Sequence, residues 1–359
     1  MNNSPVSAGN RRWYTLHRPG ALIISLDLEL HWGVRHVTPI HGGYRRNLLG
    51  EWKVVPRILA LFREYGVAAT WATVGFLFAQ SRDELEAMSP VVRPHYTNAS
   101  LSPYSEPLGR SETEDLLHFA PSLIEAIRAT PRQEVATHTF SHYYCREPGQ
   151  NRETFAADLK SAIAIAEQHG VRIRSIVFPQ NQHNPEYDDL LIDAGIICYR
   201  GTQRSWMYRD SGATGDSPWK RAVRLVDSYV NISGRQTGRW EDLANGCGGR
   251  ICNLPASFFL RPYSPSRQRL QKLHFDRVAG SIRRAGAEGE VIHVWWHSHN
   301  FGIHQQRNLD FLRQLLEEFV RQRETYGMQS LSMAEAATLA LGECNDGSGC
   351  GAKLLQLSP

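Results

Sequence analysis

Four side chains of this sequence have the types and the spacing of a hydrolytic metal centre. Asp27 and Glu29 stand at the end of an apolar run that begins at Ile23. His138 and His142 stand four residues apart, directly after a second short run. One carboxylate and two imidazoles, with a position left for water, form the ligand set of a hydrolytic zinc site. The sequence therefore predicts a metal-dependent hydrolase.

The two acidic residues are separated by one residue in a segment that we expect to be extended. Positions i and i+2 of a strand face the same way, so Asp27 and Glu29 would project together where the strand ends. One of them could bind a metal while the other acts as a general base on water. The alternative is an acidic pair that only forms ion pairs with arginine or caps a helix.

The spacing of His138 and His142 predicts two imidazoles on one face of a helical turn, as in other zinc hydrolases. Taken alone, this spacing is a weak signal, because histidine is a common surface residue. The position of the pair directly after a predicted strand strengthens the interpretation as metal ligands.

A third cluster follows the tryptophan-rich run at 291–296. An imidazole at this strand end could protonate a leaving amine. His297 and His299 point the same way by alternation, so geometry does not separate them, and we choose His297 because it is nearer the end of the run. Weaker candidates for contact with a substrate are Arg200, Gln180, Asn181, His299, Trp296 and Tyr143. Arg200 could hold Asp27 ionised or could make only a surface ion pair.

Strand-like apolar runs alternate with amphipathic helical stretches along most of the chain. We expect strands at 21–28, 67–74, 134–137, 175–178, 196–199, 250–254 and 291–296, and helices at 52–65, 111–129, 152–169, 187–194, 266–285 and 309–326. This alternation implies a parallel sheet with helices outside it. About seven such units fit a barrel or an incomplete barrel, whose site would lie at the C-terminal strand ends, where the polar clusters fall.

We expect one domain over residues 21–341, with an N-terminal extension at 1–20 and a C-terminal tail at 342–359. Residues 200–249 are rich in Gly, Ser, Arg and Trp and show no clear period. We interpret them as a long insertion or lid.

The composition is that of a globular protein. Hydrophobic residues make up 42% and charged residues 21% of the 359 residues, and the net charge is +4, which argues against wholesale disorder and gives no sign of nucleic-acid binding. No secretory signal and no membrane-spanning run is visible, so we expect a cytoplasmic protein. The six cysteines are too sparse for a disulfide framework; Cys247 with Cys252, or Cys344 with Cys350, could pair, but we expect free thiols.

Taken in order, the motifs resemble those of the polysaccharide deacetylase superfamily, the NodB homology domain or carbohydrate esterase family 4. The motif segments are Ser25-Leu-Asp-Leu-Glu29, Ala69-Thr-Trp-Ala-Thr-Val-Gly75, Thr137-His-Thr-Phe-Ser-His142, Phe178-Pro179 and Trp295-Trp-His297. The resemblance covers about residues 21–341. It implies a distorted (β/α)7-type barrel, a divalent metal that is usually Zn²⁺, and removal of an N-acyl group, most often N-acetyl, from an amino sugar.

The resemblance also implies roles for individual residues. Asp27 takes the position of the catalytic base, and His297 that of the acid. Glu29, His138 and His142 take the positions of the metal ligands.

Two departures from the family pattern bear on the substrate. Leu28 separates two acidic residues that are adjacent in the typical first motif, and Val177 stands where the third motif usually has an arginine. Arg200 is our candidate to supply the missing charge. The departures favour a small glycoside, or a nucleotide-linked or lipid-linked amino sugar, over a secreted polysaccharide. A deformylase, a metal-independent allantoinase-like amidohydrolase and an inactive carbohydrate-binding protein are the alternatives. The sugar and the oligomeric state are not specified.

Overall fold

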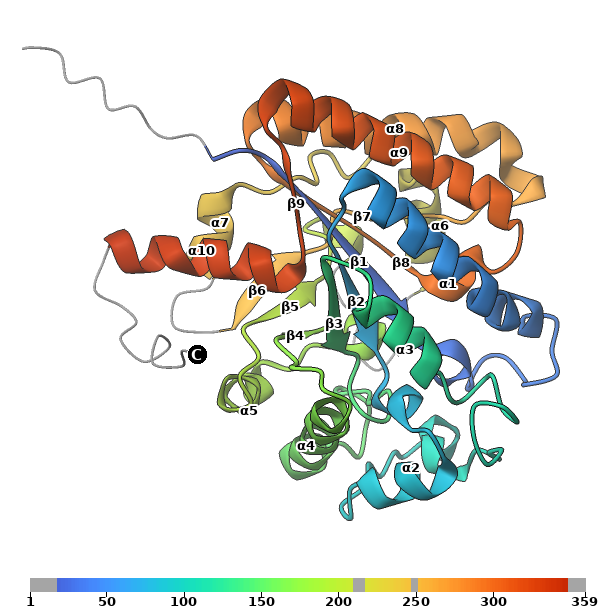
Figure 1. Cartoon of the computed structure of the whole chain (residues 1–359). Coiled ribbons are helices and arrows are strands. Elements are labelled where there is room, and N and C mark those ends of the chain that lie inside the picture. The colour runs from blue at the N-terminus through green and yellow to red at the C-terminus, as the bar shows by residue number, and fades with distance from the viewer. Residues whose placement is uncertain (1–17, 209–216, 247–250, 348–359) are drawn as a thin grey trace, which may run out of the picture.

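Parallel strands form one curled sheet at the centre of the molecule (Figure 1). The computed structural model describes residues 18–208, 217–246 and 251–347. The strands in this part of the chain are β1 (Ala21–Leu28), β2 (Ala69–Thr73), β3 (Gln133–Thr137), β4 (Ser175–Ile176), β5 (Cys198–Gly201), β6 (Cys252–Pro255), β7 (Phe258–Phe259), β8 (Val291–His297) and β9 (Gln329–Leu331). Their order is β6-β5-β4-β3-β2-β1-β8-β7, and β9 pairs with the first half of β1. The expected barrel of the (β/α)7 type is confirmed in the form of a parallel half-barrel.

Helices lie around the outside of this sheet in Figure 1. They are α1 (Arg45–Tyr65), α2 (Arg82–Met88), α3 (Pro121–Arg128), α4 (Arg152–Gln168), α5 (Asp188–Asp193), α6 (Pro218–Asp227), α7 (Trp240–Gly246), α8 (Gln271–Glu288), α9 (Gln305–Tyr326) and α10 (Met333–Gly347). None of the described helices has the length and apolar character needed to cross a bilayer.

Strand β1 is the central element because all eight of its residues are buried and it pairs with three other strands. A continuous apolar run is what a parallel strand covered on both faces requires. The parallel register sets Asp27 of β1 opposite His297 of β8 and Ala72 of β2. Two groups that are 270 positions apart in the chain are thereby placed at the same end of the sheet.

The expected helix at 111–129 is wrong in its first half. Residues 112–118 form turns, and Ser111 pairs with Ser81 in an isolated bridge. Helix α3 begins at Pro121, which occupies a first-turn position where a missing N–H costs nothing.

Two other expectations concern the ends of the chain and the cysteines. Helix α10 continues to Gly347, so the first residues of the expected tail are helical, while 348–359 and most of the expected extension at 1–20 lie outside the described residues. Cys145 and Cys198 are free, but Cys252 is disulfide-bonded, which contradicts the expectation of free thiols at that position. The insertion at 200–249 contains α6 and α7, with 209–216 and 247–249 outside the described residues.

A buried carboxyl group joins α1 to the sheet end that carries Asp27. Glu51 of α1 is fully buried and accepts a hydrogen bond from Ser298 Oγ, which also lies 3.1 Å from the backbone carbonyl oxygen of Asp27. Burial raises the pKa of Glu51 from 4.5 to about 8; the Ser298 hydrogen bond opposes this shift, and the charge of Glu29 adds to it. Glu51 is therefore protonated in the folded protein at neutral pH.

We predict that Glu51→Gln makes stability less dependent on pH. Between the ordinary pKa of 4.5 and the folded value of about 8, the folded state holds a proton that the unfolded state releases, so wild-type stability falls as pH rises. From about pH 6 to about pH 8 the variant should gain about 2 kcal/mol relative to wild type, measured by denaturant unfolding. Glu317→Gln, at an exposed position of α9, is the matched control. An unchanged difference at the two pH values would contradict the prediction.

Candidate metal centre

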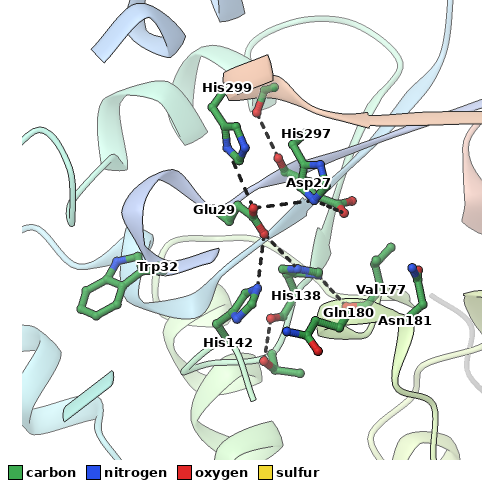
Figure 2. A network of polar contacts seen from close by, with 12 residues as sticks. Asp27, Glu29, Trp32, His138, His142, Val177, Gln180, Asn181, His297 and His299 are labelled. Atoms are coloured by element: carbon green, nitrogen blue, oxygen red, sulfur yellow. Dashed lines mark hydrogen bonds and ion pairs between the residues drawn. The ribbon is translucent and has the colours of Figure 1, made fainter. Parts of the chain in front are cut away.

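Glu29, His138 and His142 converge at the carboxyl end of the sheet (Figure 2). Glu29 directly follows β1, and the two histidines follow β3. Glu29 Oε2 lies 3.4 Å from His138 Nε2 and 3.3 Å from His142 Nε2. Ligand atoms that share one cation at bond lengths of about 2.1 Å in a tetrahedral arrangement are separated by about 3.4 Å. The three residues can therefore hold a single divalent ion without moving apart.

The protonation states of the three groups suit a cation. Burial would raise the pKa of Glu29, but the charge of His297 and hydrogen bonds with His138 and His142 hold it well below its ordinary value. Burial lowers the pKa of His142 to about 3, so its imidazole is neutral at neutral pH. His138 Nδ1 donates to the carbonyl oxygen of Val177 at 2.7 Å, so Nε2, which faces Glu29, is the ring atom that could bind a cation. A carboxylate and neutral imidazoles are the forms that bind divalent metals.

The turn after Glu29 accommodates its side chain closely. The 3-10 helix η1 (Leu30–Gly33) follows, with Leu30 at φ 45°. A Cβ atom built on Gly33 would lie 2.0 Å from Glu29 Cδ, so any larger residue would displace the carboxylate. Gly33 is thus needed for the position of the Glu29 carboxylate.

The two histidines do not lie on a helical turn, contrary to the expectation from their spacing. Residues 138–144 form bends and irregular chain, with Thr139 at φ 64° and His142 at φ 54°. Thr139 Oγ1 accepts a hydrogen bond from the backbone N–H of Tyr143 at 2.6 Å, which tightens the loop. The loop, rather than a helix, brings the two ring centroids to 5.0 Å from each other.

The carboxylate of Asp158, a residue of α4, holds this loop in place. It accepts the backbone N–H groups of Phe140 at 2.8 Å and Ser141 at 3.1 Å, and also the hydroxyl of Ser141. Burial raises the pKa of Asp158 to about 6, while these hydrogen bonds lower it. The sequence analysis did not predict a role for Asp158. Its place on the apolar face of α4, one turn from Phe155 and Ala162, could have indicated a buried acid that positions the neighbouring chain.

Arg200 and Asp27 form a buried ion pair next to the metal centre. The distances are 2.7 Å from Nη1 to Oδ1 and 2.8 Å from Nη2 to Oδ2, and both side chains are at most 2% exposed. Burial would raise the pKa of Asp27, but the charge and hydrogen bonds of Arg200 hold it below its ordinary value. Of the two interpretations of Arg200, the structure shows the pair with Asp27 and not a surface ion pair.

The two candidate acids differ in exposure. His297 Nε2 lies 3.7 Å from both Asp27 Oδ2 and Glu29 Oε1, and its side chain is 29% exposed. His299 is 2% exposed, its Nδ1 is 3.9 Å from Glu29 Oε1, and burial lowers its pKa to about 4. Figure 2 shows both imidazoles on the same side of Glu29. Only His297 is open to an incoming molecule.

The weaker substrate candidates divide into two groups. Gln180 and Asn181 lie on the loop beyond β4, with φ of 54° and 56°, and the Asn181 amide oxygen is 3.5 Å from Arg200 Nη2. Trp296 and Tyr143 are fully buried: Trp296 stacks on Phe301, and Tyr143 packs in the core. The burial of both rings gives no support to contact with a substrate, which stays a prediction for these two residues. The alternation of β8 sends Trp296 to the helix side of the sheet.

A cavity of about 330 Å³ opens beside His297. Its lining includes Trp295, Phe259, Asn181 and Gln203. Part of its wall comes from the insertion, through α6 and the turn before it: Tyr208, Arg224, Asp227 and Ser228. Its volume is at the lower end of the range of small-molecule sites.

The comparisons with known proteins agree with this fold. Residues 50–198 match the family model described as polysaccharide deacetylase. A structure from Mycobacterium smegmatis, assigned as a polysaccharide deacetylase, has a TM-score of 0.58 and 15% identity, with 96% of each chain covered. Another from Pseudomonas aeruginosa PAO1, with the same assignment, has a TM-score of 0.50 and 11% identity, with 89% of each chain covered. None of the curated proteins compared with the chain matches it significantly.

These findings confirm the resemblance to the polysaccharide deacetylase family. At such low identity, the two solved structures establish the fold alone. The family match indicates a hydrolase of the deacetylase type with a carbohydrate substrate, in a family that generally uses a divalent metal.

We predict that Asp158→Asn weakens both the fold and the metal centre. An asparagine has one acceptor oxygen, so one of the two backbone N–H groups loses its partner, at a cost of about 1–3 kcal/mol of unfolding free energy. Because the His138–His142 loop then loosens, metal affinity should fall about 10–100-fold. Denaturant unfolding and a competitive Zn²⁺ titration measure the two effects, with Asp193→Asn at an exposed position as control. Unchanged metal affinity would show that Asp158 does not position the ligands.

Proposed function

We propose that the protein is a metal-dependent N-deacetylase that removes an N-acyl group, N-acetyl in the first instance, from an amino sugar. The observation that carries this proposal is the ligand set of Glu29, His138 and His142, with Asp27 and His297 immediately beside it. A base, an acid and a cation pocket next to a cavity of about 330 Å³ are the parts that amide hydrolysis needs.

A divalent ion of the zinc class held by these three ligands would lower the pKa of a water molecule and polarise the amide carbonyl group. Asp27 is ionised and held in one orientation by Arg200. It accepts the proton of the attacking water through the lone pairs that Arg200 leaves open. His297 donates a proton to the departing amine, because it faces both the carboxylates and the cavity. His299, which is buried, keeps the Glu29 side of the site closed to solvent.

The cavity supports a sugar as the substrate. Trp295 and Phe259 supply aromatic surface, with ring centroids 4.9 Å apart, and Gln203 and Asn181 supply polar groups at the wall. Its size suits one or two sugar rings, and the rest of the substrate would extend past α6. We propose that the segment 200–249 selects the carrier: a small glycoside, a nucleotide, a lipid or a polysaccharide chain.

The function is tested by metal content and by amide hydrolysis measured on the same preparations. The substrates are N-acetylated amino sugars, free, as glycosides, nucleotide-linked and as oligosaccharides. His138→Ala should lose one Zn²⁺ per chain and all activity. Asp27→Asn should keep the metal and lose activity by at least about 100-fold, because only the proton acceptor is removed. His41→Ala, at an exposed histidine, is the control for both measurements.

The other outcomes identify the alternatives. Undiminished turnover in metal-free protein would indicate a metal-independent amidohydrolase. A metal-loaded protein that binds these sugars but hydrolyses none of them would indicate a carbohydrate-binding protein. Loss of the metal in Asp27→Asn would mean that the roles of Asp27 and Glu29 are exchanged.

We also predict that Arg200 sets the acidic limb of the pH–rate profile. In Arg200→Gln, the guanidinium no longer opposes the effect of burial on Asp27, so the pKa of the base rises. Since the base works only when ionised, the acidic limb of kcat/KM should move to higher pH by more than about one unit. Arg200→Lys should give a smaller shift, because it keeps the charge but loses the bidentate geometry. Arg172→Gln, at an exposed position, is the control. If the acidic limb of kcat/KM does not move in Arg200→Gln, Arg200 does not set the pKa of the base.

A further inference from the structure

A second group of two histidines and a glutamate lies beside the same turn η1: His31, Glu106 and His118. We call it the His31–His118 cluster. His31 belongs to η1, Glu106 follows the 3-10 turn Pro103–Ser105, and His118 precedes α3. His118 packs against Trp32, with ring centroids 4.7 Å apart, and Figure 2 shows Trp32 turned away from Glu29. The cluster is therefore separate from the metal centre described above.

The facing nitrogen atoms of the two imidazoles lie 3.1 Å apart, from His31 Nδ1 to His118 Nε2. Both rings are essentially without solvent contact, at 2% and 0% exposure. A distance of this kind requires a proton or a cation between the atoms, because two bare lone pairs would repel each other.

The other nitrogen of each ring faces a group that accepts a hydrogen bond. His31 Nε2 lies 3.1 Å from the carbonyl oxygen of Thr38, which can only accept, so Nε2 carries the proton. His118 Nδ1 lies 2.8 Å from Asp115 Oδ2. That carboxylate also accepts the backbone N–H groups of Gly109 and Leu117, at 3.0 and 3.1 Å. These three donors, against the effect of burial, hold the pKa of Asp115 below its ordinary value, so His118 Nδ1 also carries its proton.

The two inner nitrogens are therefore both lone-pair atoms when the rings are neutral, and they point at one another. A carboxylate oxygen of half-buried Glu106 lies within 4.8 Å of one ring nitrogen of each histidine. Each imidazole has an outer partner that fixes its tautomer, one a carbonyl and the other a carboxylate, as ligating histidines have in proteins.

We propose that the His31–His118 cluster is a second binding site for a divalent cation of the zinc class, with His31 Nδ1, His118 Nε2 and the Glu106 carboxylate as ligands. Two imidazoles and one carboxylate favour zinc over the hard cations Mg²⁺ and Ca²⁺, which take oxygen ligands. The ion replaces the proton that the facing nitrogens would otherwise have to share, and the negative charge of Glu106 balances part of its charge.

The location gives such an ion a structural task. Between α2 and α3, the helices in residues 89–120 are two short 3-10 turns, Ala99–Leu101 and Pro103–Ser105. Long irregular segments inside a domain need tertiary fixation. The cluster joins this segment at two points, Glu106 and His118, to η1. The backbone N–H of His31 in η1 also donates a hydrogen bond to the carbonyl oxygen of Leu117 in this segment, at 3.2 Å. The turn η1 starts at the residue after Glu29. An ion bound at the His31–His118 cluster would therefore also hold in place the turn that follows Glu29.

The test counts metal ions in the full-length protein saturated with Zn²⁺ and freed of excess by gel filtration. We expect two Zn²⁺ per chain in wild type and one in either His138→Ala or His118→Gln. The double variant should bind none. Glu106→Gln, at a half-buried and more tolerant position, should weaken the second binding event about 10–100-fold in a competitive Zn²⁺ titration. His41→Gln and Glu86→Gln, both at exposed positions, are the matched controls.

A spectroscopic measurement keeps the test valid if His118→Gln folds poorly. Co²⁺ added to His138→Ala, in which only the second site remains, should give the visible absorption of a low-coordinate cobalt ion, and Glu106→Gln in the same background should weaken it. One Zn²⁺ per chain in wild type, with no absorption from Co²⁺ in His138→Ala, would overturn the proposal and leave a proton shared between the two imidazoles. Two ions in wild type with unchanged affinity in Glu106→Gln would also overturn it, because the carboxylate would then not be a ligand.

Discussion

The arrangement of the candidate site depends on the burial of two carboxylates, Asp27 and Glu29, at the end of β1. Asp27 and Glu29 are both almost fully buried, and an ionised carboxylate in a protein interior is stable only when it is paired or bound to a cation. Asp27 has a full partner in the guanidinium of Arg200. All the basic side chains that the described structure places within ion-pairing distance of Glu29 are histidines, and the two nearest are His138 and His142. A cation bound between Glu29 and these imidazoles, as proposed, would balance the charge of Glu29.

The different pairing of the two acids also separates their chemical tasks. A carboxylate clamped by a bidentate arginine keeps a fixed orientation and a low pKa, so it cannot move to ligate an ion on its other side. Glu29 has no such clamp and is limited instead by Gly33, which leaves room for its carboxylate. Only Leu28 separates the two acids. Their side chains nevertheless have different partners, because β1 ends at Leu28 and the chain then turns into η1. The two acids therefore need not be adjacent, as in the family pattern, for the proposed base and the proposed metal ligand to lie side by side.

The parallel fold and the identity of the strands could be predicted from the sequence, because buried β-branched runs and glycine-terminated helices have local causes. The run at 21–28 and the helix end at Gly66, with φ 64°, are examples. The placement of Glu29, His138 and His142 was also predictable in outline, because parallel strands bring their ends together. The loop geometry of the histidines was not, since it depends on Asp158 from a later helix. The orientation of Trp296 was missed for a similar reason: either face of a doubly buried strand can hold an aromatic ring.

Arg200 places a positive charge beside Asp27 from a different strand than the family pattern would use. The loop after β4, where the family pattern usually supplies an arginine, carries Val177 here, and the Val177 carbonyl instead orients His138. The next strand of the sheet, β5, approaches the same point, because neighbouring parallel strands end at one edge. Arg200 reaches Asp27 from there while its guanidinium lies 4.1 Å from the centre of the Trp295 ring. A cation packed on an aromatic face and locked into a bidentate pair has little freedom to leave. The same arrangement joins the base to the ring that lines the cavity, so the orientation of Asp27 and the shape of the substrate wall depend on one side chain.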